Sequence, residues 1–105
     1  MHFVPVCKAG DVPDGQARRF VAAGVEVVIY NCGGQYFAND GVCTHALTGL
    51  EEGSIDRVRF TVECPLHGAE FDLRTGEAIT PPAVLPVKVF EVKIEGGQVL
   101  VELPD

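Results

Sequence analysis

Two short segments of this 105-residue chain each combine a cysteine with a histidine at close spacing. The first is Cys43-Thr-His45, and the second is Cys64-Pro-Leu-His67. They hold two of the four cysteines and two of the three histidines in the chain. Each pair is followed by turn sequence that contains glycine, and loop backbone can direct both side chains of a pair towards one metal centre. The pattern therefore favours metal binding over ordinary buried residues.

Two thiolates and two imidazoles suit two kinds of metal site. One is a structural zinc ion with four tetrahedral ligands. The other is a [2Fe–2S] cluster in which two histidines replace two cysteines on one iron. The remaining cysteines, Cys7 and Cys32, lie on or beside predicted strands. We interpret them as small buried hydrophobic residues, because free cysteine commonly behaves in that way and a reducing compartment disfavours a disulfide.

The segments that must position these residues read as strands. Apolar residues alternate with period two between turn signals, which predicts an all-β fold, a small antiparallel barrel or sandwich, in a single domain over residues 1–105. The predicted strands cover residues 3–6, 17–22, 25–31, 35–39, 58–63, 69–73, 87–95 and 98–103. Two longer loops, over about residues 40–56 and 64–82, carry the Cys/His pairs. The apolar pattern changes phase within residues 87–95, which predicts a bulge near Val89 and Phe90.

Charge and hydropathy disfavour two classes of protein, nucleic-acid binders and membrane-spanning proteins. The chain has 8 basic and 15 acidic residues, a formal charge of −7, and nucleic-acid binders usually present basic surfaces. No run of about 18 apolar residues is present, so we expect no membrane span. The N-terminus lacks the features of a secretory signal, which predicts a cytoplasmic protein. We find no nucleophile–base constellation, so we do not expect an enzyme.

At the two Cys/His segments the sequence resembles the Rieske iron–sulfur family. The resemblance rests on Cys43-Thr-His45, on Cys64-Pro-Leu-His67-Gly-Ala-Glu-Phe and on the following TGEAITPP, and the predicted strands extend it over the whole chain. It implies one Rieske-type [2Fe–2S] cluster. Cys43 and Cys64 would hold its inner iron, and His45 and His67 would hold its outer iron.

Differences from the Rieske proteins of electron-transport chains indicate which subgroup of the family the sequence resembles. Rieske proteins of respiratory and photosynthetic chains carry an extra cysteine pair that forms a disulfide, where this chain has Thr48 and Leu66. They also carry a serine and a tyrosine that donate hydrogen bonds to sulfur, where this chain has Ala69 and Phe71. The sequence is instead similar to the soluble, low-potential ferredoxins of bacterial multicomponent aromatic-ring dioxygenases.

That resemblance implies a one-electron carrier with two protein partners. A flavin-containing NAD(P)H ferredoxin reductase would supply the electron, and a terminal Rieske non-haem iron oxygenase would accept it. We expect a monomer. Two alternatives stay open, namely a Rieske-like small subunit of another redox enzyme such as nitrite reductase, and a structural zinc-binding module.

Residues around the ligands suggest a docking surface. An apolar tip is expected from Ala46, Leu47, Leu66, Pro81 and Pro82. Glu51 and Glu52 would form an acidic rim that steers a basic partner, or else an ordinary solvated loop.

Overall fold

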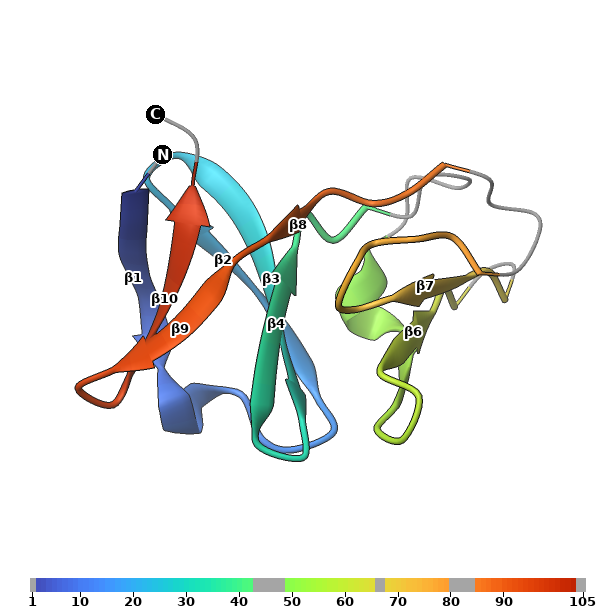
Figure 1. The fold of residues 1–105 in the computed structure, drawn as a ribbon, viewed down its shortest axis with the longest axis horizontal. Coiled ribbons are helices and arrows are strands. Elements are labelled where there is room, and N and C mark those ends of the chain that lie inside the picture. Colours follow the sequence, from blue (N-terminus) through green and yellow to red (C-terminus); the bar gives the residue numbers. More distant parts are fainter. Residues whose placement is uncertain (1, 43–48, 66–67, 80–84, 104–105) are drawn as a thin grey trace.

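The computed structural model describes residues 2–42, 49–65, 68–79 and 85–103. Within these residues the chain forms antiparallel strands in three sheets, joined by turns and two short 3₁₀ helices. Figure 1 shows two lobes side by side, with both ends of the chain at the same end of the larger lobe. Neither of the described helices is long and apolar enough to cross a membrane. The predicted all-β antiparallel fold is confirmed.

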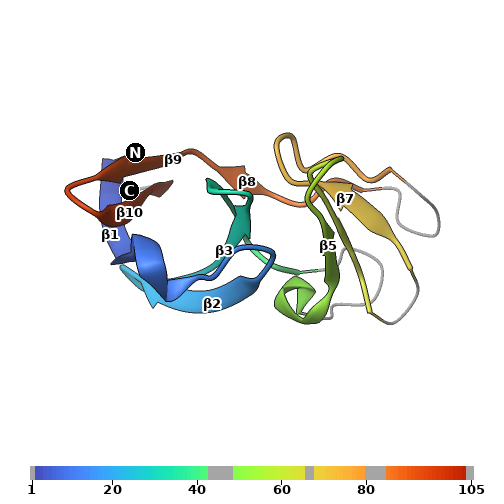
Figure 2. The ribbon, with the colours of Figure 1, turned by 90° about the horizontal axis from the view of Figure 1, so that it is seen from below.

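The larger lobe consists of two sheets with the strand orders β1–β10–β9 and β2–β3–β4–β8. Seen from below, these strands curve into a ring, as expected for a small barrel (Figure 2). The 3₁₀ helix η1 (Ala9–Asp11) follows the first strand. The strands of this lobe are β1 (His2–Lys8), β2 (Ala17–Ala22), β3 (Val25–Cys32), β4 (Gln35–Asn39), β8 (Val89–Phe90), β9 (Val92–Glu95) and β10 (Gln98–Leu103).

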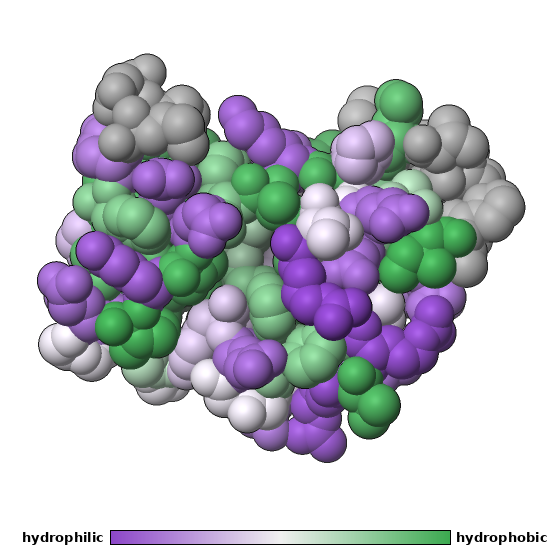
Figure 3. Space-filling view, in the orientation of Figure 1, coloured by the Kyte–Doolittle hydropathy of each residue, from purple (hydrophilic) through white to green (hydrophobic). Residues whose placement is uncertain are grey.

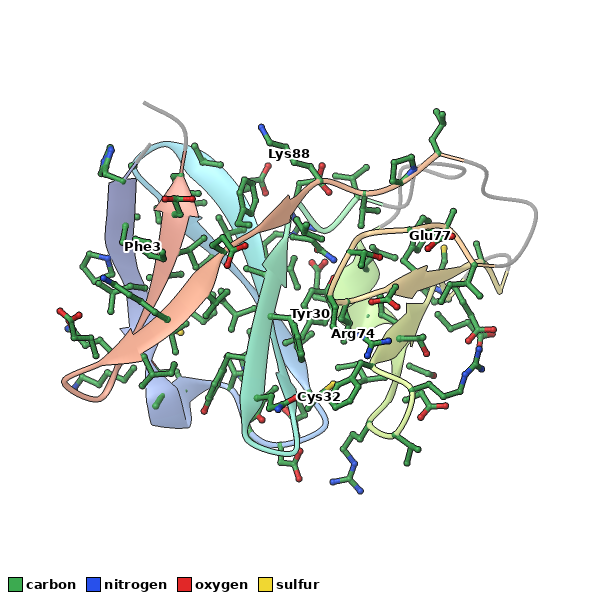
Figure 4. The ribbon with its side chains drawn as sticks, viewed as in Figure 1. Phe3, Tyr30, Cys32, Arg74, Glu77 and Lys88 are labelled. Carbon is green, nitrogen blue, oxygen red and sulfur yellow. The ribbon has the colours of Figure 1, made fainter. Side chains whose placement is uncertain are left out.

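Strand β3 is buried on both faces and connects the cores of the two lobes. Val27 and Ile29 point into the barrel, where they pack in one apolar cluster. Val28, Tyr30 and Cys32 point the other way, into a second cluster shared with the smaller lobe. Figure 4 shows Tyr30 and Cys32 at this boundary. Successive side chains of a strand alternate between its faces, so the apolar run of β3 serves two cores.

The smaller lobe is a three-stranded sheet with a 3₁₀ helix beside it. Its elements are η2 (Leu50–Glu52), β5 (Ser54–Asp56), β6 (Thr61–Glu63) and β7 (Glu70–Asp72). Val62 of β6 is paired with Phe71 of β7, and both side chains are fully buried. In the sequence, the first Cys/His segment precedes η2 and the second lies between β6 and β7, so both segments adjoin elements of the smaller lobe.

Two features of the smaller lobe correct the sequence analysis. The predicted strand over residues 58–63 begins only at Thr61, because Asp56 Oδ1 accepts the N–H groups of Val58 and Arg59 and closes a turn there. Val58 is consequently 85% exposed. The predicted loop over residues 40–56 contains η2 and β5, a strand of three residues that is too short to show a clear alternation.

The segment predicted as one strand over residues 87–95 is two strands. Val89 and Phe90 pair with β4, whereas Val92 to Glu95 pair with β10 in the other sheet. The break falls at Glu91, where the chain crosses between the sheets. The phase change in the sequence therefore marks a change of sheet rather than the predicted bulge. The register shift of this lobe lies in β1, between Pro5 and Cys7.

The boundary between the lobes is covered by polar side chains over an apolar base. Phe37 and Phe60 meet edge to face with their ring centroids 5.6 Å apart. The Arg74 guanidinium lies over the Phe60 ring at 5.4 Å. On the face drawn in Figure 3, hydrophilic side chains gather over this boundary. The smaller lobe is thus packed firmly against β3 and β4, which holds the candidate site in a fixed relation to the barrel.

Candidate metal centre

The first Cys/His segment is held at its base by the residues on either side. Val42 and Gly49 form an isolated antiparallel bridge. The Leu50 N–H donates a hydrogen bond of 2.8 Å to the carbonyl of Gly41. We call residues 41–42 and 49–51 the neck. It fixes the two points between which residues 43–48 run, including Cys43 and His45.

Gly41 occupies a position in the neck that only glycine fits. Its φ of +70° lies in the left-handed region, and an added Cβ would come within 2.2 Å of Val28 Cγ2. Asn39 Oδ1 accepts both the Gly41 N–H, over 2.8 Å, and the Tyr30 hydroxyl, over 2.9 Å. Burial raises the pKa of Tyr30, so its hydroxyl remains a donor. Two buried hydrogen bonds, both accepted by Asn39, therefore connect Gly41 of the neck to Tyr30 of β3.

Arg19 of β2 reaches the neck from the larger lobe. Its Nε donates to Glu51 Oε2 and its Nη2 to Glu51 Oε1, each over 2.9 Å. The same Nη2 donates to the Gly41 carbonyl, also over 2.9 Å. The hydrogen bonds from Arg19 hold the pKa of Glu51 below its ordinary value, so the carboxylate is ionised and paired at neutral pH.

This pairing changes the expectation of an acidic rim. The Glu51 side chain is only 25% exposed, and its charge is matched by Arg19. Glu52 is exposed. Glu51 is therefore not an unpaired surface charge, because its partner Arg19 lies 32 residues away in the sequence. The steering role of the two glutamates stays a prediction.

The second Cys/His segment begins at Cys64, directly after β6. Its side chain is buried, with 1% of the residue exposed, and its thiol forms no disulfide. The Cys64 N–H donates to the Ala69 carbonyl over 2.7 Å, and the Gly68 N–H donates to the Cys64 carbonyl over 3.1 Å. Cys64 packs in the second apolar cluster together with Ala69 and Phe71, which are both fully buried. The second segment thus begins with a buried thiol, on a backbone that is hydrogen-bonded to Gly68 and Ala69.

A third segment, residues 80–84, is also held on both sides by described residues. The Ile79 N–H donates to the Glu70 carbonyl over 2.8 Å, and the Val87 N–H donates to the Gly76 carbonyl over 2.9 Å. Phe71 and Ala78 form an isolated bridge. These contacts connect the N-terminal flank of the third segment to β7, and its C-terminal flank to Gly76 in the turn after β7.

Of the four predicted ligands, the structure places Cys64. Cys43, His45 and His67 lie outside the described residues. The residues predicted to surround the ligands or to replace a family disulfide also lie outside the described residues, namely Ala46, Leu47, Thr48, Leu66, Pro81 and Pro82. Their assigned roles stay predictions.

The two cysteines outside the motifs fit the buried role predicted for them. Cys32 is 2% exposed and packs in the second apolar cluster. Cys7 is half-buried beside the barrel core. Burial, with a smaller contribution from Asp11, raises the pKa of the Cys7 thiol to about 11. A thiol with such a pKa is protonated and unreactive at neutral pH.

The residues present fit a metal centre of mixed cysteine and histidine ligation. Cys64 offers a free thiol beneath an apolar cover, and such surroundings limit the access of water to a bound metal. The neighbouring positions 69 and 71 carry an alanine and a phenylalanine, neither of which presents a side-chain donor. The donor set of two cysteines and two histidines suits a [2Fe–2S] cluster of the Rieske type.

Sequence reasoning missed the residues that support the ligands. The Arg19–Glu51 pair and the Tyr30–Asn39 hydrogen bond each join residues from different elements. Nothing local in the sequence marks either pair. The one available signal was an arginine inside an apolar strand, which calls for a buried or half-buried acidic partner without identifying it.

Comparison with known proteins gives consistent matches along the chain. A family model described as the Rieske [2Fe-2S] domain matches residues 2–91. The 3-phenylpropionate/cinnamic acid dioxygenase ferredoxin subunit of Shigella flexneri is 37% identical over 105 residues, which cover 100% of this chain and 97% of the relative. The ferredoxin component of biphenyl 2,3-dioxygenase from Rhodococcus jostii is 40% identical over 103 residues, 98% of this chain and 94% of the relative.

Solved structures agree with these matches. The ferredoxin of carbazole 1,9a-dioxygenase from Nocardioides aromaticivorans superposes with a TM-score of 0.89 at 33% identity, covering 96% of this chain and 97% of that one. A structure of the complex of reduced oxygenase and oxidised ferredoxin in carbazole 1,9a-dioxygenase matches with a TM-score of 0.84 at 36% identity, covering 94% and 91%. A putative nitrite reductase small subunit, at 17% identity and a TM-score of 0.84, shares the fold alone.

Proposed function

Because the chain belongs to the Rieske [2Fe–2S] domain family, we propose that it carries single electrons from a flavin-containing NAD(P)H reductase to a terminal ring-hydroxylating oxygenase. The observation that carries this proposal is the 37% identity, over the whole chain, to a dioxygenase ferredoxin subunit. The solved complex of an oxygenase with its ferredoxin supports the second partner. In this role the protein is a component of a dioxygenase system and does not itself transform the substrate.

The proposal assigns four ligands. Cys43 and Cys64 hold the inner iron, and His45 and His67 hold the outer iron, so each Cys/His segment contacts both irons. When bound, the cluster supplies a one-electron couple whose neutral histidine ligands raise its potential above that of plant-type ferredoxins with four cysteine ligands. The buried position of Cys64 supports its place at the inner iron.

The surroundings of Cys64 favour the low end of the Rieske range. Hydrogen bonds donated to cluster sulfur stabilise the reduced, more negative state and so raise the potential. Ala69 and Phe71 are fully buried beside Cys64 in the same cluster, and their side chains have no hydroxyl to donate. Leu50 and Val62 pack in this cluster and are also fully buried, which keeps water away from the thiol. Such a centre suits electrons delivered by a flavin.

The remaining parts of the proposal concern the setting of the protein. We place it in the cytoplasm, as a monomer with two protein partners and no nucleic-acid partner. The formal charge of −7 supports docking to basic surfaces on those partners. The apolar residues predicted around the histidines would form the contact through which the electron passes, since electron-transfer interfaces are small and transient.

A structural zinc ion on the same four ligands is the principal alternative, and the metal content decides between the two. A nitrite reductase subunit has weaker support, because the likeness to that group is in the fold alone. A zinc protein would be colourless and would contain no sulfide, whereas a Rieske protein is coloured and reducible. These differences do not depend on any partner.

Reconstitution tests the carrier role directly. The purified protein replaces the ferredoxin component in a biphenyl 2,3-dioxygenase assay that contains the reductase and oxygenase of the Rhodococcus jostii system. We expect NAD(P)H-dependent product formation that requires this protein. Under anaerobic conditions, NAD(P)H and the reductase without the oxygenase should bleach its visible absorption. The matched control is Cys7→Ser, which leaves all four proposed ligands in place and should support the same turnover.

A loaded protein that no flavin-containing reductase reduces would contradict the carrier role. Because partner specificity also affects turnover, the oxygenase step is measured separately with dithionite-reduced protein, which needs no reductase. Reduced protein that transfers no electron to either the biphenyl or the 3-phenylpropionate oxygenase would reject the second half of the proposal.

A further inference from the structure

Arg19 makes an unusually complete set of contacts for a residue at the edge of a small protein. Both nitrogens at one side of its guanidinium bind the Glu51 carboxylate, Nε to Oε2 and Nη2 to Oε1, over 2.9 Å each. Nη2 also donates to the Gly41 carbonyl over 2.9 Å. The side chains of Arg19 and Glu51 are each only 25% exposed. Glu26 adds a weaker contact at 3.4 Å from the solvent side.

These contacts connect the two sides of the neck. Gly41 lies two residues before Cys43, and Glu51 lies three residues after the end of the stretch 43–48, which contains Cys43 and His45. One guanidinium therefore binds both ends of the stretch that carries Cys43 and His45. Since Arg19 belongs to β2, it also fixes the neck to the barrel.

The backbone of the neck is built around the Glu51 carboxylate. A Cβ at Gly49 would lie 2.6 Å from Glu51 Oε1, so the carboxylate folds back closely over position 49. An added Cβ at Gly41 would lie 2.7 Å from Arg19 Nη2. Glycine at both positions thus leaves room for the ion pair. An ordinary surface ion pair does not need such space, nor a third hydrogen bond to the backbone.

We infer that Arg19 is a positioning residue for the metal centre, because its guanidinium holds both ends of the segment that carries Cys43 and His45 against the barrel. The inference rests on the ligand set proposed above. Fixing the two ends of a loop lowers the conformational entropy lost when its side chains bind a metal. The planar fork of arginine can bind the carboxylate with two donors while also reaching the carbonyl, whereas a lysine ammonium is a point charge.

Three variants of the loaded protein test this role, with Arg18→Met as the matched control. Arg18 is the exposed neighbour of Arg19 on the same strand, and among the described residues its side chain makes a long hydrogen bond of 3.5 Å to Gln16. Arg19→Met removes the fork and the charge. Arg19→Lys keeps the charge. Gly49→Ala keeps every charge but introduces a methyl group where the Glu51 carboxylate lies.

Two measurements are made on each variant. Hydrogen–deuterium exchange of the peptide that contains Leu50 reports on opening of the neck, because the Leu50 amide donates to Gly41. The rate at which visible absorption is lost in the presence of an iron chelator reports on retention of the cluster. Far-ultraviolet circular dichroism and exchange of the β3 peptide show whether the barrel stays folded.

We expect Arg19→Met to accelerate both exchange at Leu50 and loss of the cluster by about tenfold, equivalent to roughly 1.4 kcal/mol. Arg19→Lys and Gly49→Ala should accelerate both at least about threefold, and Arg18→Met should match the wild type. The β3 peptide should exchange at the wild-type rate throughout. If Arg19→Met does not fold, Arg19→Lys and Gly49→Ala decide the matter.

Wild-type exchange at Leu50 in the Arg19 variants would overturn the inference, because the neck would then be held without Arg19. Faster exchange at Leu50 with unchanged cluster loss would also overturn it, since the first segment would then not control the metal centre. If the variants behave as expected but the loaded wild type transfers no electron to an oxygenase, the carrier role is rejected and the role of Arg19 still stands.

Discussion

The backbone N–H of Cys64 donates to the carbonyl of Ala69 over 2.7 Å, and this bond closes the turn that begins the second ligand segment. Both residues are buried in the same apolar cluster. The side chain at position 69 therefore stands at the base of that turn, close in the fold to the proposed inner-iron ligand. A serine at position 69 therefore introduces a hydroxyl into the apolar cluster that holds the Cys64 thiol.

Ala69→Ser should raise the reduction potential. A neutral hydrogen bond contributes about 1 kcal/mol, which corresponds to some tens of millivolts for a one-electron couple. Protein-film voltammetry should place the wild type in the lowest part of the range of about −150 to +300 mV and the variant above it. Ala22→Ser puts the same hydroxyl into the barrel core and should leave the potential unchanged. A wild-type value above about +100 mV, in the upper half of that range, would contradict the low-potential assignment.

Gly41→Ala should destabilise the protein and its metal site. The left-handed backbone costs an alanine about 1–2 kcal/mol, and overpacking against Val28 adds about 1–3 kcal/mol. Gly24→Ala is the control, because its φ of +77° is similar but nothing lies within 4 Å of an added Cβ. Urea unfolding should show the larger loss for Gly41→Ala, accompanied by reduced iron content. Equal losses in the two variants would show that contact with Val28 carries no cost.

Cys7→Ser and Cys32→Ser should retain the visible and electron paramagnetic resonance spectra of the wild type. Cys32 is buried in the second apolar cluster, so a serine hydroxyl there should cost roughly 1–3 kcal/mol of stability. Cys7 is half-buried, and its replacement should cost less. Loss of the cluster from either variant would mean that the assigned pair of cysteine ligands is wrong.

The contribution of Glu51 to stability should depend on pH. Arg19 lowers the pKa of Glu51 in the folded state, so the ion pair stabilises the protein above the unfolded pKa of about 4.3. That stabilisation is lost as the pH falls through the lowered folded pKa. Wild type should therefore exceed Glu51→Gln in stability by up to about 1 kcal/mol at pH 7, and the difference should shrink towards zero in strong acid. Urea titrations of both proteins measure it, and a difference that is independent of pH would exclude the ion pair as its source.

Much of the fold could be predicted from the sequence because its strands are clearly punctuated. The turns at Gly33-Gly34 and Gly96-Gly97 separate alternating segments, and the strands on the two sides of each turn pair with one another. The crossing at Glu91 was read as a bulge, since a change of phase looks the same whether a strand bends or changes sheet. The turn before Thr61 was missed, because it is made by the Asp56 side chain inside an apolar alternation.

For the candidate site, the sequence names four ligands through two short motifs with fixed spacing, and this assignment stays a prediction. The contacts that surround these motifs could not be predicted. The contact of Arg19 with Glu51 arises only once the lobes pack together, and that of Tyr30 with Asn39 only once β3 pairs with β4. The sequence also does not reveal whether a surface charge is paired. Glu51 appears there as a free carboxylate, but it is paired with Arg19 in the fold.

Analysis of metal and acid-labile sulfide tests the central claim most directly. In the wild type we predict two irons and two sulfides per chain, with a Rieske-type electron paramagnetic resonance signal on reduction. His67→Ala and Cys64→Ala should contain no metal and give no signal, because metal binding and the ordering of the ligand segments are coupled. Cys32→Ser serves as the control that retains both. A wild-type protein that contains zinc without sulfide, or a His67→Ala variant with its full complement of iron and sulfide, would contradict the assignment.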